Sequence, residues 1–355
     1  MSLYPDSSQR REWVLTPTQL AQRRSNGASR YAQEILLSNP AVLPTDIMTD
    51  HEQYQLFSYY QRRISEYGSA FSLPIGVVGT AVVFFKRFYL NRTVMDEDPR
   101  LIAVSALLLA TKAEEAHIRV SDLAKTTAIS TELLLKFEQI LLDGISFHLK
   151  VHTPFRAVQG LVNLIPDLSK SEMKNRIELA DIEVMNALYT DAIFLYTPSQ
   201  IALACVERTA SNLSSPAPGK DIFSMVLERS QNREDADKLK AIVKTINEII
   251  DESVNSSSKG DLDEFRKLKN KRDQCRNLFR DPTSDFAKSQ LVQIDEARNA
   301  ERLEKHKQAD NTMCLFQTEL QATVSVGIAD DNEEFVIKTA EVKRRRINTR
   351  SSNAG

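Results

Sequence analysis

The sequence predicts an all-α fold with two tandem five-helix domains and flanking helices at both ends. Glycine is scarce, at 10 of 355 residues, and helix interiors disfavour glycine. A capping residue followed by proline, which is typical of a helix start, occurs at Asp98-Pro99 and again at Thr197-Pro198. Apolar residues recur at helical spacing, and the best strand-like alternation is the short segment Ala322–Gly327.

The composition bounds the class of protein. A chain of 355 residues predicts two domains plus extensions. The net charge of −2 gives no basic field for nucleic acid or anionic lipid. Cys205, Cys275 and Cys314 form no CxxC pair, so neither a disulfide framework nor a zinc site is expected.

No targeting or membrane segment is expected. Met1–Arg11 lacks the apolar core of a secretory signal. The longest strongly apolar run, Leu101–Ala110, has about half of the ~20 residues that span a bilayer. We therefore expect no membrane partner and an intracellular chain.

Residues 1–49 are predicted to form an N-terminal helix and loop. Thr16 caps this helix, Pro17 occupies its first position, and the helix runs to about Leu37. Asn39-Pro40 ends it.

Residues 50–150 are predicted to form the first five-helix domain. Its helices cover about Asp50–Tyr67, the segment after Pro74, the segment after Asp98-Pro99, Val120–Thr127, and a segment capped by Ser130. The third helix is apolar almost all round between residues 101 and 110, which is typical of a helix encased by others.

Residues 151–254 are predicted to repeat this arrangement. Thr153-Pro154 opens a helix, Ser171 caps a long one, and Thr197-Pro198 opens another. Pro198 lies 99 residues after Pro99, and small and branched apolar residues follow each proline. We interpret this as a duplicated domain whose third helix is buried in each copy.

Residues 255–310 are predicted to form a C-terminal helical extension. The polar segment Asn255–Gly260 precedes a charged helix over Asp261–Arg280, and a further amphipathic helix is expected over Phe286–Lys307. Residues 311–355 are expected to be a tail without regular structure. The basic cluster Lys343–Arg346 is either a nuclear localisation signal or a solvated charge run.

Catalytic constellations are absent from the sequence. It contains no Gly-rich phosphate loop, no HRD or DFG kinase signature and no GxSxG. His148 and His152 are four apart, but no third metal ligand lies near, so we expect them to be capping or core residues. Glu114 and Glu115 are expected to be a solvated helix end. The prediction is therefore a chain that is not an enzyme and holds no cofactor or metal.

Two charged residues stand out against their apolar surroundings. Lys112 follows the buried third helix, and Glu138 falls on or beside the apolar stripe of the fifth helix. A buried carboxylate needs a partner. Either the two residues form an internal ion pair, or both face a groove and bind backbone groups of a partner. Periodicity alone slightly favours the ion pair.

Several ordered motifs resemble the cyclin family. They span roughly residues 8–280 and consist of Ser8–Trp13, Val78–Asn91 with its Lys-Arg-Phe-Tyr-Leu run, Leu107–Glu115, Phe147–Phe155 and Leu195–Leu203. The resemblance implies that the two five-helix domains are cyclin boxes. It also implies that the chain binds and activates a cyclin-dependent kinase catalytic subunit.

The resemblance also implies where the kinase binds. In cyclins the third and fifth helices of the first box contact the kinase, and Lys112 and Glu138 match the family lysine and glutamate of that contact. The resemblance thus favours the partner-binding interpretation of both. The other expected interface residues are Glu115, Leu134, Phe137 and Leu141.

The Lys86–Leu90 run is similar to the branch of the family that belongs to the CDK-activating kinase. That branch implies a RING-finger assembly subunit and the TFIIH core as further partners, phosphorylation of kinase activation loops and of the RNA polymerase II tail, and a nuclear location. His51–Phe57 lacks the MRxIL-type motif of substrate-recruiting cyclins, so substrate recruitment by this chain alone is not expected.

One alternative is a general transcription factor with paired cyclin folds that binds DNA directly. That function predicts a basic groove and usually an N-terminal zinc ribbon. The net charge of −2 and the lack of CxxC pairs argue against it, and no direct nucleic-acid contact is expected.

Overall fold

The computed structural model describes residues 4–39, 42–212, 222–229, 236–256 and 262–281, with shorter stretches between 284 and 313. Every regular element in this described part is helical, which confirms the predicted all-α class. None of its helices is long and apolar enough to cross a bilayer. The predicted strand-like segment 322–327, the basic cluster 343–346 and Cys314 lie outside the described residues.

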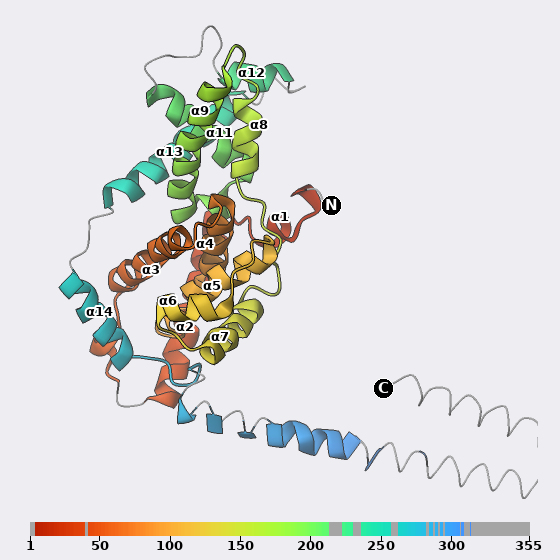
Figure 1. Cartoon of the computed structure of the whole chain (residues 1–355). Coiled ribbons are helices and arrows are strands. Elements are labelled where there is room, and N and C mark those ends of the chain that lie inside the picture. The colour runs from red at the N-terminus through yellow and green to blue at the C-terminus, as the bar shows by residue number, and fades with distance from the viewer. Residues whose placement is uncertain are drawn as a thin grey trace, which may run out of the picture. The chain divides into compact units, whose positions relative to one another are not determined.

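The first five-helix domain consists of α3 to α7 (Figure 1). Their bounds are α3 Asp50–Ala70, α4 Ile75–Tyr89, α5 Pro99–Ala113, α6 Val120–Thr127 and α7 Thr131–Gly144. Helix α5 begins at the predicted capped proline, where the Asp98 side chain accepts a hydrogen bond from the Arg100 N–H. All residues from Ile102 to Thr111 are buried, so α5 is the encased central helix that its composition predicts.

The second domain repeats this plan. It consists of α8 Phe155–Val162, α9 Lys170–Tyr189, the single turn α10 Ala192–Leu195, α11 Pro198–Asn212, α12 Ile222–Arg229 and α13 Ala236–Ser256. Residues 201–206 of α11 are buried, so the proline-started third helix is central here too. One helix start was predicted wrongly: Ser169, not Ser171, caps α9, because its hydroxyl and the Glu172 carboxylate bond each other's backbone N–H groups.

The two domains pack against each other through α4 and α9. Gly79 on α4 makes this possible, because a Cβ there would lie 2.6 Å from the Phe155 ring and 3.0 Å from Leu188. Phe155 and Leu188 both belong to the second domain and are buried. A glycine in the second turn of α4 therefore permits this close approach of the two domains.

The flanking segments pack on the first domain, and the N-terminal segment also bonds Asp191 and Phe194 of the second domain. The N-terminal elements are η1 Tyr4–Asp6, α1 Ser8–Glu12, α2 Pro17–Ser38 and η2 Pro44–Asp46, and α14 covers Leu262–Gln274. Thr16 and Gln19 form a complete capping box at the start of α2. Gly27 of α2 is buried against the backbone of Asn91, which a Cβ would approach to 2.7 Å.

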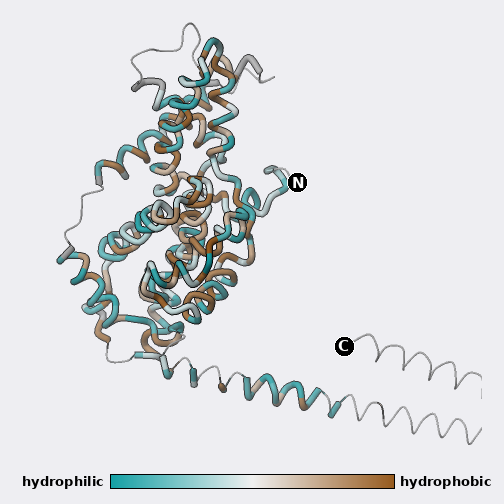
Figure 2. Tube along the Cα trace, in the orientation of Figure 1, coloured by the Kyte–Doolittle hydropathy of each residue, from teal (hydrophilic) through white to brown (hydrophobic). Residues whose placement is uncertain are grey.

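Helix α14 ends earlier than the predicted Arg280. The chain leaves the helix after Gln274 because its next groups bond the rest of the protein: Tyr31 donates to the Cys275 carbonyl at 2.6 Å, and the Asn277 N–H bonds the Met95 carbonyl at 2.9 Å. Residues 288–355 form a separate unit, in which residues 295–305 are helical and largely hydrophilic (Figure 2).

Candidate functional site

Helices α5 and α7 bring Lys112 and Glu138 together at their edge. Lys112 lies in the last turn of α5, and its Nζ is 2.7 and 2.8 Å from the two carboxylate oxygens of Glu138 in the middle of α7. The internal ion pair that the sequence left open is therefore present in the free chain. The lysine side chain is 46% exposed, whereas that of Glu138 is only 9% exposed.

This geometry leaves the pair capable of a second role. A lysine ammonium has three N–H donors, and Glu138 takes two of them. The remaining donor lies on the half-exposed side of the pair, where a carbonyl oxygen of another protein can accept it. A partner could therefore bind Lys112 without any rearrangement of the ion pair. This contact with a partner stays a prediction.

Leu134, Phe137 and Leu141 lie on the same inward stripe of α7 as the buried Glu138. Their exposed fractions are 0, 2 and 0%, and they belong to the hydrophobic core. Their contact with a kinase stays a prediction, and in the free chain none of the three presents a surface. Their role here is to hold α7 against α5, so that Glu138 is fixed in position.

Glu115 lies just beyond α5 and is exposed, as expected of a helix end. Its backbone is left-handed, with φ of 57°, and this turn lets the Ala116 N–H bond the Thr111 carbonyl at 2.8 Å. Glu114 is also exposed, yet it accepts a hydrogen bond of 2.8 Å from the Thr80 hydroxyl of α4. Only Glu115 is therefore a candidate for contact with a partner.

Two exposed apolar residues, one on α7 and one just after it, were not identified from the sequence. Leu135 is 41% exposed and Phe147, just after α7, is 66% exposed. Leu135 shares a helix face with Glu138, three residues later. The run of three leucines at 133–135 was the available signal, since three consecutive residues of a helix cannot all face the core.

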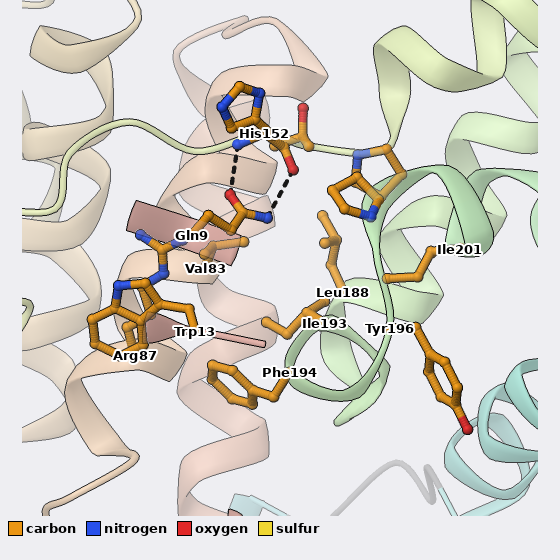
Figure 3. A pocket seen from close by; sticks show the side chains of 13 residues that line it. Gln9, Trp13, Val83, Arg87, His152, Leu188, Ile193, Phe194, Tyr196 and Ile201 are labelled. Atoms are coloured by element: carbon orange, nitrogen blue, oxygen red, sulfur yellow. Dashed lines mark hydrogen bonds between the residues drawn. The ribbon is translucent and has the colours of Figure 1, made fainter. Parts of the chain in front are cut away.

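A second cluster, which we call the N-terminal clasp, consists of Gln9, Trp13, His148 and His152. Figure 3 shows three of these residues, Gln9, Trp13 and His152. The Gln9 side chain accepts from the His152 N–H at 2.7 Å and donates to its carbonyl at 3.1 Å. The Trp13 N–H donates to Nδ1 of His148 at 3.0 Å. Both histidines thus serve packing, and the described residues contain no group of side chains able to hold a metal.

The Lys86–Leu90 run joins the clasp to both domains. Buried Lys86 donates to the Thr190 carbonyl of the second domain and lies 3.9 Å from the Asp191 carboxylate, and its burial lowers its pKa to about 8. Arg87 donates to the His148 carbonyl at 3.0 Å and stacks on Trp13 at 4.8 Å. Through these contacts the Lys86–Leu90 run holds the two domains in a fixed relative position.

Comparison with known proteins agrees with this architecture. Residues 35–150 match the family model for the cyclin N-terminal domain, and residues 153–251 match the cyclin C-terminal domain. Cyclin-H of Xenopus laevis is 31% identical over 224 residues, which are 59% of this chain and 69% of that protein.

Two solved structures are similar in fold. A chain in the structure of the CAK complex of Chaetomium thermophilum bound to ATP-γ-S matches 83% of this chain and 94% of its own length, with a TM-score of 0.69 and 26% identity. A chain in the yeast TFIIK (Kin28/Ccl1/Tfb3) complex matches 70% of this chain and all of its own length, with a TM-score of 0.57 and 26% identity.

The chain belongs to the cyclin family. Within that family it is similar to cyclin H, which agrees with the Lys86–Leu90 run that pointed to this branch.

Proposed function

We propose that this chain is the regulatory cyclin of a CDK-activating kinase, which it serves as an activating subunit without chemistry of its own. The observation that carries the proposal is the likeness to a chain of the CAK complex over 83% of this sequence, at a TM-score of 0.69. The RING-finger assembly subunit, the TFIIH core and a nuclear location follow as further parts of the proposal.

The kinase-binding surface that we propose is the exposed edge of α5 and α7. It presents Lys112 with Glu138 beneath it, Glu115 at the end of α5, and the exposed apolar side chains of Leu135 and Phe147. Exposed apolar side chains can bury surface against a partner, and a charged pair can fix the register of that contact. An obligate interface of this kind buries more than about 2,000 Å² in total.

The mechanism follows from differential binding. A cyclin-dependent kinase must bring its αC helix inward so that its catalytic Lys–Glu pair forms. A rigid partner shifts that equilibrium only by binding the active conformer better than the inactive one. The encased α5 and the core-anchored α7 supply a surface that does not deform to suit the inactive conformer.

The test is a charge reversal at the buried end of the pair. Glu138→Lys should keep the helical circular dichroism spectrum and weaken binding to the purified kinase subunit at least about tenfold, since two ammonium groups would then face each other. Leu135→Asp should also weaken binding, without a loss of stability. The control is Glu248→Lys on α13, an exposed site that should leave binding unchanged.

A folded Glu138→Lys variant that activates the kinase at the level of the parent protein would overturn the assignment of this surface. If the parent protein itself failed to bind or stimulate any cyclin-dependent kinase, the proposed function would be wrong as a whole.

A further inference from the structure

A large open groove lies on the surface between the N-terminal helix and the two domains. It has a volume of about 920 Å³, and its walls come from α2, α3 and α13, with the end of α4 and the α9–α10 turn as its floor. No residue of α5 or α7 lines it, so it is distinct from the proposed kinase-binding surface. We call it the α2–α3–α13 groove.

The α3 wall is aromatic and partly exposed. Tyr54 is 53% exposed, and Phe57, one turn further along α3, is partly buried beneath it. Ile249 of α13 contributes a partly buried aliphatic side chain from the other wall. Exposed aromatic side chains beside a concave surface are typical of interaction sites, where they bury much area at a low cost in side-chain entropy.

The α2 wall is built from small residues. Ala21, Ser25 and Ala28 line the groove at intervals of four and three residues, and all are exposed. Small side chains at this spacing let the backbone of another helix approach closely. A neighbouring face of α2 is already in contact with the first domain, because Gly27 is buried against the backbone of Asn91.

The unpaired charges of the groove favour a cationic occupant, because its three cations, Arg24, Lys86 and Arg92, are each paired with a carboxylate. The carboxylate of Asp191 at the floor is already neutralised, since Arg24 bonds both its oxygens at 2.7 and 2.8 Å and Lys86 lies 3.9 Å away. Asp50 at the start of α3 and Glu252 on α13 are exposed, and neither has an ion pair with any residue that the structure describes. Two opposite walls therefore each present an unneutralised carboxylate.

We propose that the α2–α3–α13 groove docks an amphipathic helix of a partner protein, with apolar side chains on Tyr54 and Phe57 and lysine or arginine side chains toward Asp50 and Glu252. This is the helix-in-groove mode of recognition, in which spaced apolar anchors supply affinity and flanking charges set register. The groove thus gives the protein a second docking surface that is independent of the kinase.

The test is a selection from a phage-displayed library of random 16-residue peptides on the full-length protein. Selected peptides should combine apolar residues at helical spacing with lysine or arginine. Fluorescence anisotropy should show that Tyr54→Glu weakens their binding at least tenfold, and that Asp50→Asn with Glu252→Gln weakens it several-fold and reduces its salt dependence. Leu37→Glu, an exposed site on α2 outside the groove lining, is the matched control and should bind like the parent protein.

Each other outcome overturns the proposal. Selection of acidic peptides, of no peptide, or of peptides that still bind Tyr54→Glu would place the recognition elsewhere. Sedimentation should show a monomer, and a dimer that Tyr54→Glu dissociates would make a second copy of this chain the occupant instead. Circular dichroism of each variant separates lost binding from lost folding, and kinase binding plays no part in the assay, so it stands apart from the proposed function.

Discussion

The side chain of Gln9 and the main chain of His152 hold each other by two hydrogen bonds, 143 residues apart in the sequence. His152 lies in the connection between the two domains, so this contact ties α1 to the point where one domain passes into the next (Figure 3). The Gln9 side chain thus pairs with the backbone N–H and the carbonyl of His152, which belongs to no helix and makes no helical hydrogen bonds.

Replacing Gln9 by alanine should therefore destabilise the whole chain. Gln9→Ala leaves the His152 N–H and carbonyl without their partners, which costs about 1–3 kcal/mol of unfolding free energy. Urea unfolding followed by circular dichroism measures the loss. Gln22→Ala on the exposed face of α2 is the control and should change stability by less than about 0.5 kcal/mol. Equal stability of the two variants would show that the contact contributes nothing.

The packing of the two domains can be tested with two glycines of one helix. At Gly79 an added methyl group would collide with Phe155 and Leu188, so Gly79→Ala should destabilise the chain by about 1–3 kcal/mol. At Gly76, in the same helix, the space for a Cβ is open within 4 Å. Gly76→Ala should instead stabilise the chain by about 0.5 kcal/mol, because it removes backbone freedom from the unfolded state.

Thermal unfolding of the two variants decides this prediction. The melting temperatures should move in opposite directions from that of the parent protein. If the melting temperature of Gly79→Ala equals or exceeds that of Gly76→Ala, the packing of α4 against the second domain is less tight than the structure shows.

The fold class was predictable because its signals are local. A capped proline, a scarcity of glycine and an all-apolar run at 101–110 each act within one helix, and the structure confirms what they predict. The Ser169 cap was missed because either serine, Ser169 or Ser171, can cap a helix. Only Ser169 has a glutamate, Glu172, three residues later, which is the spacing that a capping box requires. A search for the capping-box spacing would have found it.

The candidate site was only partly predictable, because burial depends on contacts between distant segments. Periodicity placed Leu134, Phe137 and Leu141 on one stripe of α7, but it cannot say whether a stripe faces the core or a partner. The early end of α14 likewise depends on Tyr31, which lies 244 residues before Cys275 in the chain. No local signal at either residue reports that hydrogen bond.

The Lys112–Glu138 pair should matter more for binding than for stability. An ion pair with a half-exposed lysine is screened by solvent, so a double-mutant cycle with Lys112→Met and Glu138→Gln should give a coupling of about 1 kcal/mol or less. The fully exposed Lys174–Glu178 pair on α9 is the comparison and should give about 0.3–0.5 kcal/mol. A coupling near 3 kcal/mol at Lys112–Glu138 would mean that the pair is chiefly structural.

Glu97 gives the fold a dependence on pH. Its side chain is buried between α4 and α5, where its Oε1 pairs with Arg92 and its Oε2 has no hydrogen-bond partner among the described residues. Burial raises the pKa of Glu97 from 4.5 to about 7, and the nearby carboxylate of Asp96 adds to the rise, while Arg92 and Arg280 oppose it. The folded chain therefore holds a proton on Glu97 that the unfolded chain releases.

This difference fixes the sign of the effect. The stabilisation from the protonated carboxyl is fully present below about pH 4.5 and is lost as the pH rises through about 7, a change on the order of 3 kcal/mol. Glu97→Gln stays neutral and can still accept from Arg92, so its unfolding free energy should fall less than that of the parent protein between pH 5 and pH 8. Urea unfolding at both pH values measures the two slopes. Glu248→Gln at an exposed site should retain the parent slope, and an unchanged slope in Glu97→Gln would show that Glu97 is ionised throughout.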